Sequence, residues 1–173
     1  MNKARTFTSA LLLAALAHQP LALAQDRQDQ HTLKDGEART GSKFRDVLVR
    51  SAGVPLNLRY DQLTAEHKAI LKAPYASMGD DDEPPFPAAG LAALLSEVQQ
   101  AGSILEARGL MRLHANVNAQ GKVTTIAVMK SVDSRLDMYV AGLLMRTPFK
   151  PARCRGEPCA QEYLFAMDFI ANP

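Results

Sequence analysis

The sequence lacks the residue patterns on which most metal and nucleophilic sites depend. Only two cysteines and four histidines occur in 173 residues. His31, His67 and His114 have no second histidine, cysteine or carboxylate at a metal-ligand spacing. Ser131 is not in the Gly-x-Ser-x-Gly setting of an activated serine. These absences give no support for a metal site or nucleophilic catalysis, and we expect no cofactor.

A calcium loop is also disfavoured. Asp80, Asp81 and Asp82 are adjacent, whereas an EF-hand loop places its ligands at alternate positions around a glycine. The acidic run leads into Pro84-Pro85-Phe86-Pro87, which favours extended backbone. We therefore interpret residues 79–87 as a solvated acidic and proline-rich linker.

Long apolar runs are scarce, and the only candidate lies at the N-terminus. A basic start is followed by the apolar run Ala10–Ala17 and by the small residues Ala22-Leu23-Ala24, which is typical of a secretory signal peptide cleaved after Ala24. An uncleaved membrane anchor is the alternative. It needs about 20 continuous apolar residues, and His18-Gln19-Pro20 interrupts this run. We predict an exported, periplasmic protein with residues 1–24 removed.

The charge balance gives no sign of a nucleic-acid or anionic membrane partner. The chain carries 20 basic and 18 acidic residues, and the predicted cleavage removes Lys3 and Arg5 but no acid. The mature chain is therefore close to neutral.

The region before the linker is predicted to contain little regular structure. Residues 25–42 are polar with a single leucine, which predicts a flexible leader because too little apolar area is available to offset the ordering entropy. A small N-terminal segment, 43–78, follows. Within it, residues 44–50 read as a short strand, and Thr64 can cap a helix over 65–71 that Pro74 terminates.

After the linker, hydrophobic periodicity predicts a helix and then a hairpin. Apolar residues at a helical spacing predict a helix over 88–100, and Gly102 is expected to terminate it. Alternation from Met111 to Val117 predicts a strand with one buried face, and a turn at 119–121 leads to a second strand over 123–130 that is apolar on much of both faces.

The chain then returns to a helix and a strand. Ser134 can cap a helix that ends by Pro148. In the following strand, Tyr163, Phe165, Met167 and Phe169 alternate with polar or smaller residues. The order helix, strand, strand, helix, strand predicts an α+β fold, with helices packed on one face of a three-stranded antiparallel sheet.

The two cysteines, Cys154 and Cys159, flank a Gly-Pro-containing turn. In an exported chain, two extended arms joined by such a turn favour a structural disulfide, while free thiols and metal binding are the alternatives. The spacing is not that of a Cys-x-x-Cys redox motif.

The C-terminal half resembles the C-terminal domain of TonB over about Pro84 to Ile170. The resemblance rests on short segments, which are Pro85-Phe86-Pro87, Val117–Val123, Val128–Ser131, Leu136-Asp137, Phe149-Lys150-Pro151-Ala152 and Gly156-Glu157-Pro158. The interval from Pro87 to Leu110 is longer than is usual in that family, and the two cysteines are a second departure.

The resemblance implies that residues 88–173 form a TonB C-terminal-like domain whose last strand is a sheet edge. In that family the edge receives an extended peptide from an outer-membrane receptor by strand addition. The implied partner-binding residues are Gln161, Glu162, Tyr163, Leu164, Phe165, Ala166, Met167 and Asp168. An envelope protein or receptor peptide is the partner expected, and an enzymatic activity is not.

Two other functions stay open at this point. A true energy transducer would keep its N-terminus as an anchor, but the long proline-rich spacer of such proteins is absent. An envelope enzyme would need a site built by residues 44–75, which show no catalytic spacing.

Overall fold

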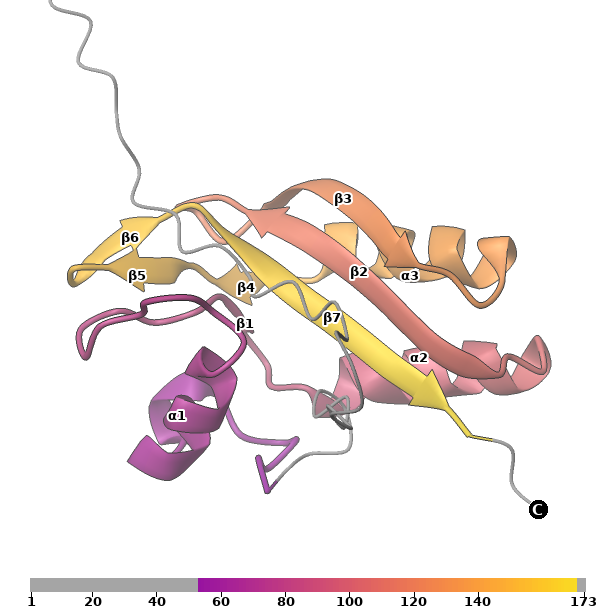
Figure 1. Cartoon of the computed structure of the whole chain (residues 1–173), viewed down its shortest axis with the longest axis horizontal. Coiled ribbons are helices and arrows are strands. Elements are labelled where there is room, and N and C mark those ends of the chain that lie inside the picture. Colours follow the sequence, from indigo (N-terminus) through magenta and orange to yellow (C-terminus); the bar gives the residue numbers. More distant parts are fainter. Residues whose placement is uncertain (1–52, 171–173) are drawn as a thin grey trace, which may run out of the picture.

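The protein is an α+β structure in which a three-stranded antiparallel sheet packs against two helices (Figure 1). The computed structural model describes residues 53–170. The predicted signal peptide, leader and 44–50 strand lie outside these residues. Within the described residues, no helix combines the length and apolar character needed to cross a bilayer.

The sheet consists of β2 (Gly109–Val117), β3 (Val123–Lys130) and β7 (Gln161–Phe169), in the order β3-β2-β7. Every second residue of β2, from Met111 to Val117, is buried. Its neighbour β7 buries the alternating aromatic and methionine set that begins at Tyr163. These alternations confirm the two predicted strands, because side chains on successive residues point to opposite faces of a sheet.

Strand β3 differs from the sequence prediction. It was predicted to be apolar on much of both faces, yet little of this apolar surface is covered: only Val123 is buried, and Val128 and Met129 are 47% and 52% exposed. The strand is the second edge of the sheet. Its pairing with β2 also shifts register between Arg112 and Leu113 and between Asn116 and Val117.

Helix α2 (Ala92–Ile104) covers the sheet with α3, but it begins and ends later than the predicted 88–100. Residues before it form a turn, and the backbone N–H groups of Leu91 and Ala92 donate to the carbonyl of Leu56. The sequence predicts that Gly102 terminates α2, but the helix continues through this residue. Gly102 is buried inside the last helical turn. The helix instead ends just before Glu106, whose positive φ of 51° breaks the helical path.

Helix α3 (Ser134–Arg146) carries the predicted apolar stripe, and Leu136, Val140, Leu143 and Leu144 are buried. Its N-cap is Asp133 rather than Ser134, because the Asp133 carboxylate accepts a hydrogen bond from the backbone N–H of Arg135 at 2.8 Å.

The N-terminal part of the described chain contains a 3-10 turn (Tyr60–Gln62) and helix α1 (Ala65–Lys72). The Thr64 hydroxyl caps α1 by accepting from the backbone N–H of His67, as the sequence predicts. Four very short strands form two further pairs, β1 (Phe86–Pro87) with β4 (Phe149–Lys150) and β5 (Ala152–Cys154) with β6 (Glu157–Cys159).

The segment interpreted as a solvated linker is exposed over residues 79–81 but largely buried from Asp82 to Pro87. Asp82 is 7% exposed and Phe86 is 1% exposed. Two backbone hydrogen bonds join Glu83 to Arg153, and β1 pairs with β4. The prediction was wrong because the groups that cover this segment lie some 70 residues further along the chain.

Candidate strand-binding edge

Strand β7 lies at one edge of the sheet, and among residues 53–170 only β2 pairs with it. The eight residues predicted to bind a partner therefore all lie in an edge strand, but they differ in solvent exposure. Gln161, Tyr163, Phe165, Ala166 and Met167 are buried, Glu162 and Leu164 are half-buried, and Asp168 is exposed. A partner strand would therefore meet mainly the backbone of β7 rather than its side chains.

The register shows which backbone groups of β7 point outward. In a central antiparallel strand, the N–H and C=O of one residue point to one neighbour and those of the next residue to the other. The carbonyl of Asn116 in β2 accepts from the Thr124 hydroxyl of β3, so even-numbered residues of β2 face β3. Their partners across the register are the even-numbered residues of β7. The backbone groups of Glu162, Leu164, Ala166 and Asp168 consequently point away from the sheet.

The first of these outward groups are occupied by a tyrosine from outside the sheet. The Tyr75 hydroxyl donates to the carbonyl of Glu162 at 2.7 Å, and the same oxygen accepts from the backbone N–H of Leu164. Tyr75 is 5% exposed, and this burial raises the pKa of its hydroxyl. One phenol group thus makes both hydrogen bonds that an added strand would make at this point.

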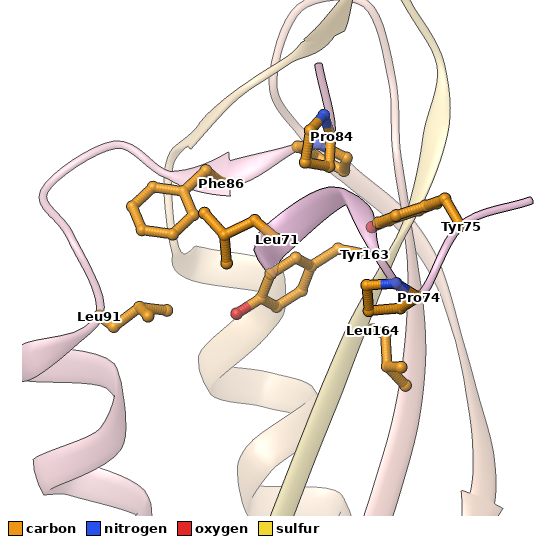
Figure 2. Close-up of a pocket in the computed structure, with 9 residues that line it drawn as sticks. Leu71, Pro74, Tyr75, Pro84, Phe86, Leu91, Tyr163 and Leu164 are labelled. Atoms are coloured by element: carbon orange, nitrogen blue, oxygen red, sulfur yellow. The ribbon is translucent and has the colours of Figure 1, made fainter. Parts of the chain in front are cut away.

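A small apolar cavity of about 50 Å³ lies beside Tyr75 (Figure 2). It is lined by both Tyr163 and Leu164, whose side chains leave opposite faces of β7, so the cavity lies beside the strand edge itself. The other lining residues come from the end of α1, from the residues before and at the start of β1, and from the N-cap of α2; they are Leu71, Pro74, Pro84, Pro85, Phe86 and Leu91. The N-terminal part of the protein therefore borders the Glu162–Leu164 end of the edge.

An ion pair fastens the same N-terminal part to the sheet domain. Lys150 lies 3.0 Å from a carboxylate oxygen of Glu83, and its ammonium group is 4.4 Å from the centre of the Tyr60 ring. Burial lowers the pKa of Lys150, and the hydrogen bond and charge of Glu83 oppose that effect. The pair is partly shielded from solvent, which strengthens the attraction between the two charges but also adds a desolvation cost, and the lowered pKa of Lys150 indicates that this cost is the larger effect.

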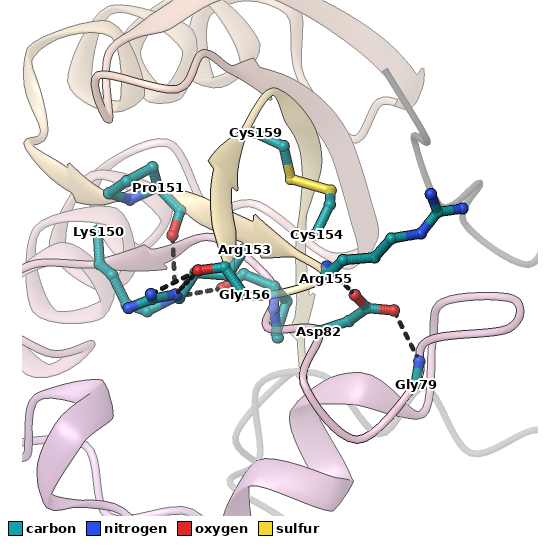
Figure 3. Close-up of a disulfide and its surroundings, with 10 residues drawn as sticks. Gly79, Asp82, Lys150, Pro151, Arg153, Cys154, Arg155, Gly156 and Cys159 are labelled. Carbon is teal, nitrogen blue, oxygen red and sulfur yellow. Dashed lines mark hydrogen bonds between the residues drawn. A yellow bond between two sulfur atoms is a disulfide. The ribbon is translucent and has the colours of Figure 1, made fainter. Parts of the chain in front are cut away.

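The cysteines form a disulfide, Cys154–Cys159, that joins β5 to β6. Figure 3 shows the hairpin beside Asp82, whose carboxylate accepts from the backbone N–H groups of Arg155 and Gly79, at 2.7 and 2.8 Å. Arg155 has a positive φ of 51°. The disulfide hairpin and the segment around the buried Asp82 therefore support each other.

The residues considered for catalysis or metal binding have structural contacts. Ser131 donates a hydrogen bond to Asp137 at the start of α3, and His114 lies 3.7 Å from a carboxylate oxygen of Glu162. Across residues 53–170, no three histidine, cysteine, aspartate or glutamate side chains are close enough to hold a metal ion.

The contact of Tyr75 with β7 is not predicted by the sequence. Tyr75 follows α1 by three residues, and nothing in its neighbourhood indicates that it contacts a strand 87 residues away. Comparison of the chain with models of protein families and with curated proteins found no match.

Proposed function

We propose that this protein is an exported binding module that accepts an extended segment of an envelope protein as an added strand on the outer edge of β7. The observation that carries the proposal is the outward direction of the Ala166 and Asp168 backbone groups on an edge strand. Such an edge is a template for a further strand, because its N–H and C=O groups are already in ladder geometry.

Three features support the proposed compartment and partner. The N-terminal pattern is that of a secretory signal peptide, and a disulfide is favoured in an oxidising compartment such as the periplasm. The resemblance of residues 84–170 to the TonB C-terminal domain supports a receptor peptide as the partner. We further propose that the protein binds and does not catalyse, with transfer of energy to the outer membrane as a function of the same edge if the N-terminus stays uncut.

Binding at β7 can be separated from binding at the other edge with two matched proline variants. Ala166→Pro removes one outward N–H from β7. By the same register argument, Val128 in β3 is paired with Leu113 and points outward, so Val128→Pro removes one outward N–H from β3. Neither substitution removes an internal ladder bond, which is the condition under which an edge strand tolerates proline. Because Ala166 is buried, its variant is compared with Asp168→Pro at an exposed position of β7.

The probe is a set of twelve-residue peptides selected from a random display library against the wild-type protein. We expect Ala166→Pro to weaken their binding at least tenfold, because proline removes a main-chain bond and its ring blocks close approach. Val128→Pro should leave binding within twofold. Thermal melting checks that both variants fold, and Asp168→Pro serves as a second β7 variant. Equal binding by wild type and the folded β7 variants would show that the peptides do not add to this edge.

A further inference from the structure

We infer that Tyr75 determines the register of the bound segment, by occupying the first outward position of β7 so that a partner strand begins beyond it. The inference rests on the proposed function, because a register has meaning only if a strand adds to β7. It assigns a specificity-determining role to a residue outside the sheet and outside the eight residues predicted to bind.

The Tyr75 hydroxyl bonds to backbone groups of β7 that an added β-strand would otherwise bond. It donates to the carbonyl of Glu162 and accepts from the N–H of Leu164. An added strand would bond these same two groups, through two residues if it were antiparallel to β7 or through one if it were parallel. While the hydroxyl is in place, those groups are unavailable. The outward groups on the C-terminal side of Tyr75 that are left for a partner are the Leu164 carbonyl and the backbone groups of Ala166 and Asp168.

The surroundings of Tyr75 hold it in this position. Its ring is nearly inaccessible to solvent, and Pro74 and Leu71 line the cavity next to it. Displacing the side chain would expose the ring and leave the polar groups of two β7 residues to find other partners, each of which costs free energy. A partner strand therefore meets a fixed end at Tyr75 rather than a side chain that moves aside.

Tyr75→Phe is the matched substitution, since it keeps the ring and removes only the hydroxyl. In the free wild-type protein we expect slow hydrogen exchange at the Leu164 amide and faster exchange at Ala166 and Asp168, measured by NMR. In free Tyr75→Phe, the Leu164 amide should exchange at least tenfold faster. Loss of a merely structural contact would instead raise exchange across the sheet.

The second measurement adds a twelve-residue peptide selected against the wild-type protein. In the wild-type complex the Ala166 and Asp168 amides should become protected, with Leu164 unchanged. Because the ring also stands in the way of a partner strand, this measurement uses Tyr75→Ala, whose folding is checked by thermal melting. In Tyr75→Ala the peptide has spare residues with which to pair further, so Leu164 should become protected on binding and affinity should rise about three- to tenfold.

The outcomes separate this inference from the proposed function. Peptide protection at Ala166 and Asp168 in both the wild type and Tyr75→Ala, with no gain at Leu164 and no gain in affinity in Tyr75→Ala, would overturn the role of Tyr75 alone. Absence of protection at Ala166 and Asp168 in the wild-type complex would overturn strand addition at β7, and the role of Tyr75 with it. Slow Leu164 exchange in free Tyr75→Phe would show that the hydroxyl does not occupy this position.

Discussion

Gly102 in α2 lies directly against the Phe169 ring of β7, and a Cβ atom at this glycine would be 2.2 Å from Cε1 of that ring. The last turn of the helix and the end of the edge strand can approach this closely only because position 102 has no side chain. This contact explains why glycine, an unfavourable residue in a helix interior, is retained there.

Gly102→Ala is predicted to destabilise the protein by about 1–3 kcal/mol, because the ring must shift within a packed core. The matched control is Gly142→Ala in α3, where the added Cβ meets only the end of the flexible Arg146 side chain at 3.2 Å. That variant should gain up to about 1 kcal/mol from helix propensity. Urea unfolding measures both, and equal stability of the two variants would refute the close contact.

Asp82 is predicted to contribute to stability through its two backbone partners rather than through its charge. Asp82→Ala should cost about 1–3 kcal/mol, because the partly buried hydrogen bonds from the N–H groups of Gly79 and Arg155 to the carboxylate are lost. Asp81→Ala is the control, since Asp81 is exposed, and it should change stability by less than about 0.5 kcal/mol. Similar losses for both variants in urea unfolding would contradict the buried role of Asp82.

The disulfide is predicted to stabilise the folded protein. Replacing Cys154 and Cys159 together by serine should lower stability by about 2 kcal/mol, the chain-entropy value for so short a loop. Thermal melting under non-reducing conditions measures the loss. Two alkylatable thiols in freshly isolated protein would show that the bond does not form in the native compartment.

The cap of α3 predicts a pH dependence in acid. The hydrogen bond from the Arg135 side chain holds the pKa of Asp133 at about 2, below its ordinary value of 3.8. Because the folded-state pKa is lowered, the stabilisation is present above about pH 4 and is lost as the pH falls towards 2. Asp133→Asn keeps a capping side chain but cannot titrate. The wild type should therefore melt higher than this variant above pH 4, and the difference should vanish near pH 2. A difference that is constant over this range would exclude the linkage.

The regular elements could be predicted because their patterns are local. Alternation in β2 and β7 and the apolar stripe of α3 are each complete within a dozen residues. The N-cap predicted for α3 is one residue too late, because Asp133 and Ser134 are adjacent and both are good capping residues.

The remaining features depend on contacts between distant parts of the chain. Gly102 has the usual appearance of a helix end, and only the ring of Phe169 shows why it is inside the helix. The acidic and proline-rich segment has the composition of a linker, yet β4 and Arg153 cover it. The Tyr75 contact with β7 has no sequence signal at all, so the edge residues could be predicted but not the group that occupies part of the edge.

The most direct test of the central claim is isotope-edited NMR of the wild-type protein bound to a selected peptide, which records contacts between peptide and protein backbone protons. Strand addition to β7 predicts such contacts at Ala166 and Asp168, in the regular alternation of a ladder. Backbone contacts along β3 around Val128, or contacts confined to side chains of the helices, would contradict it.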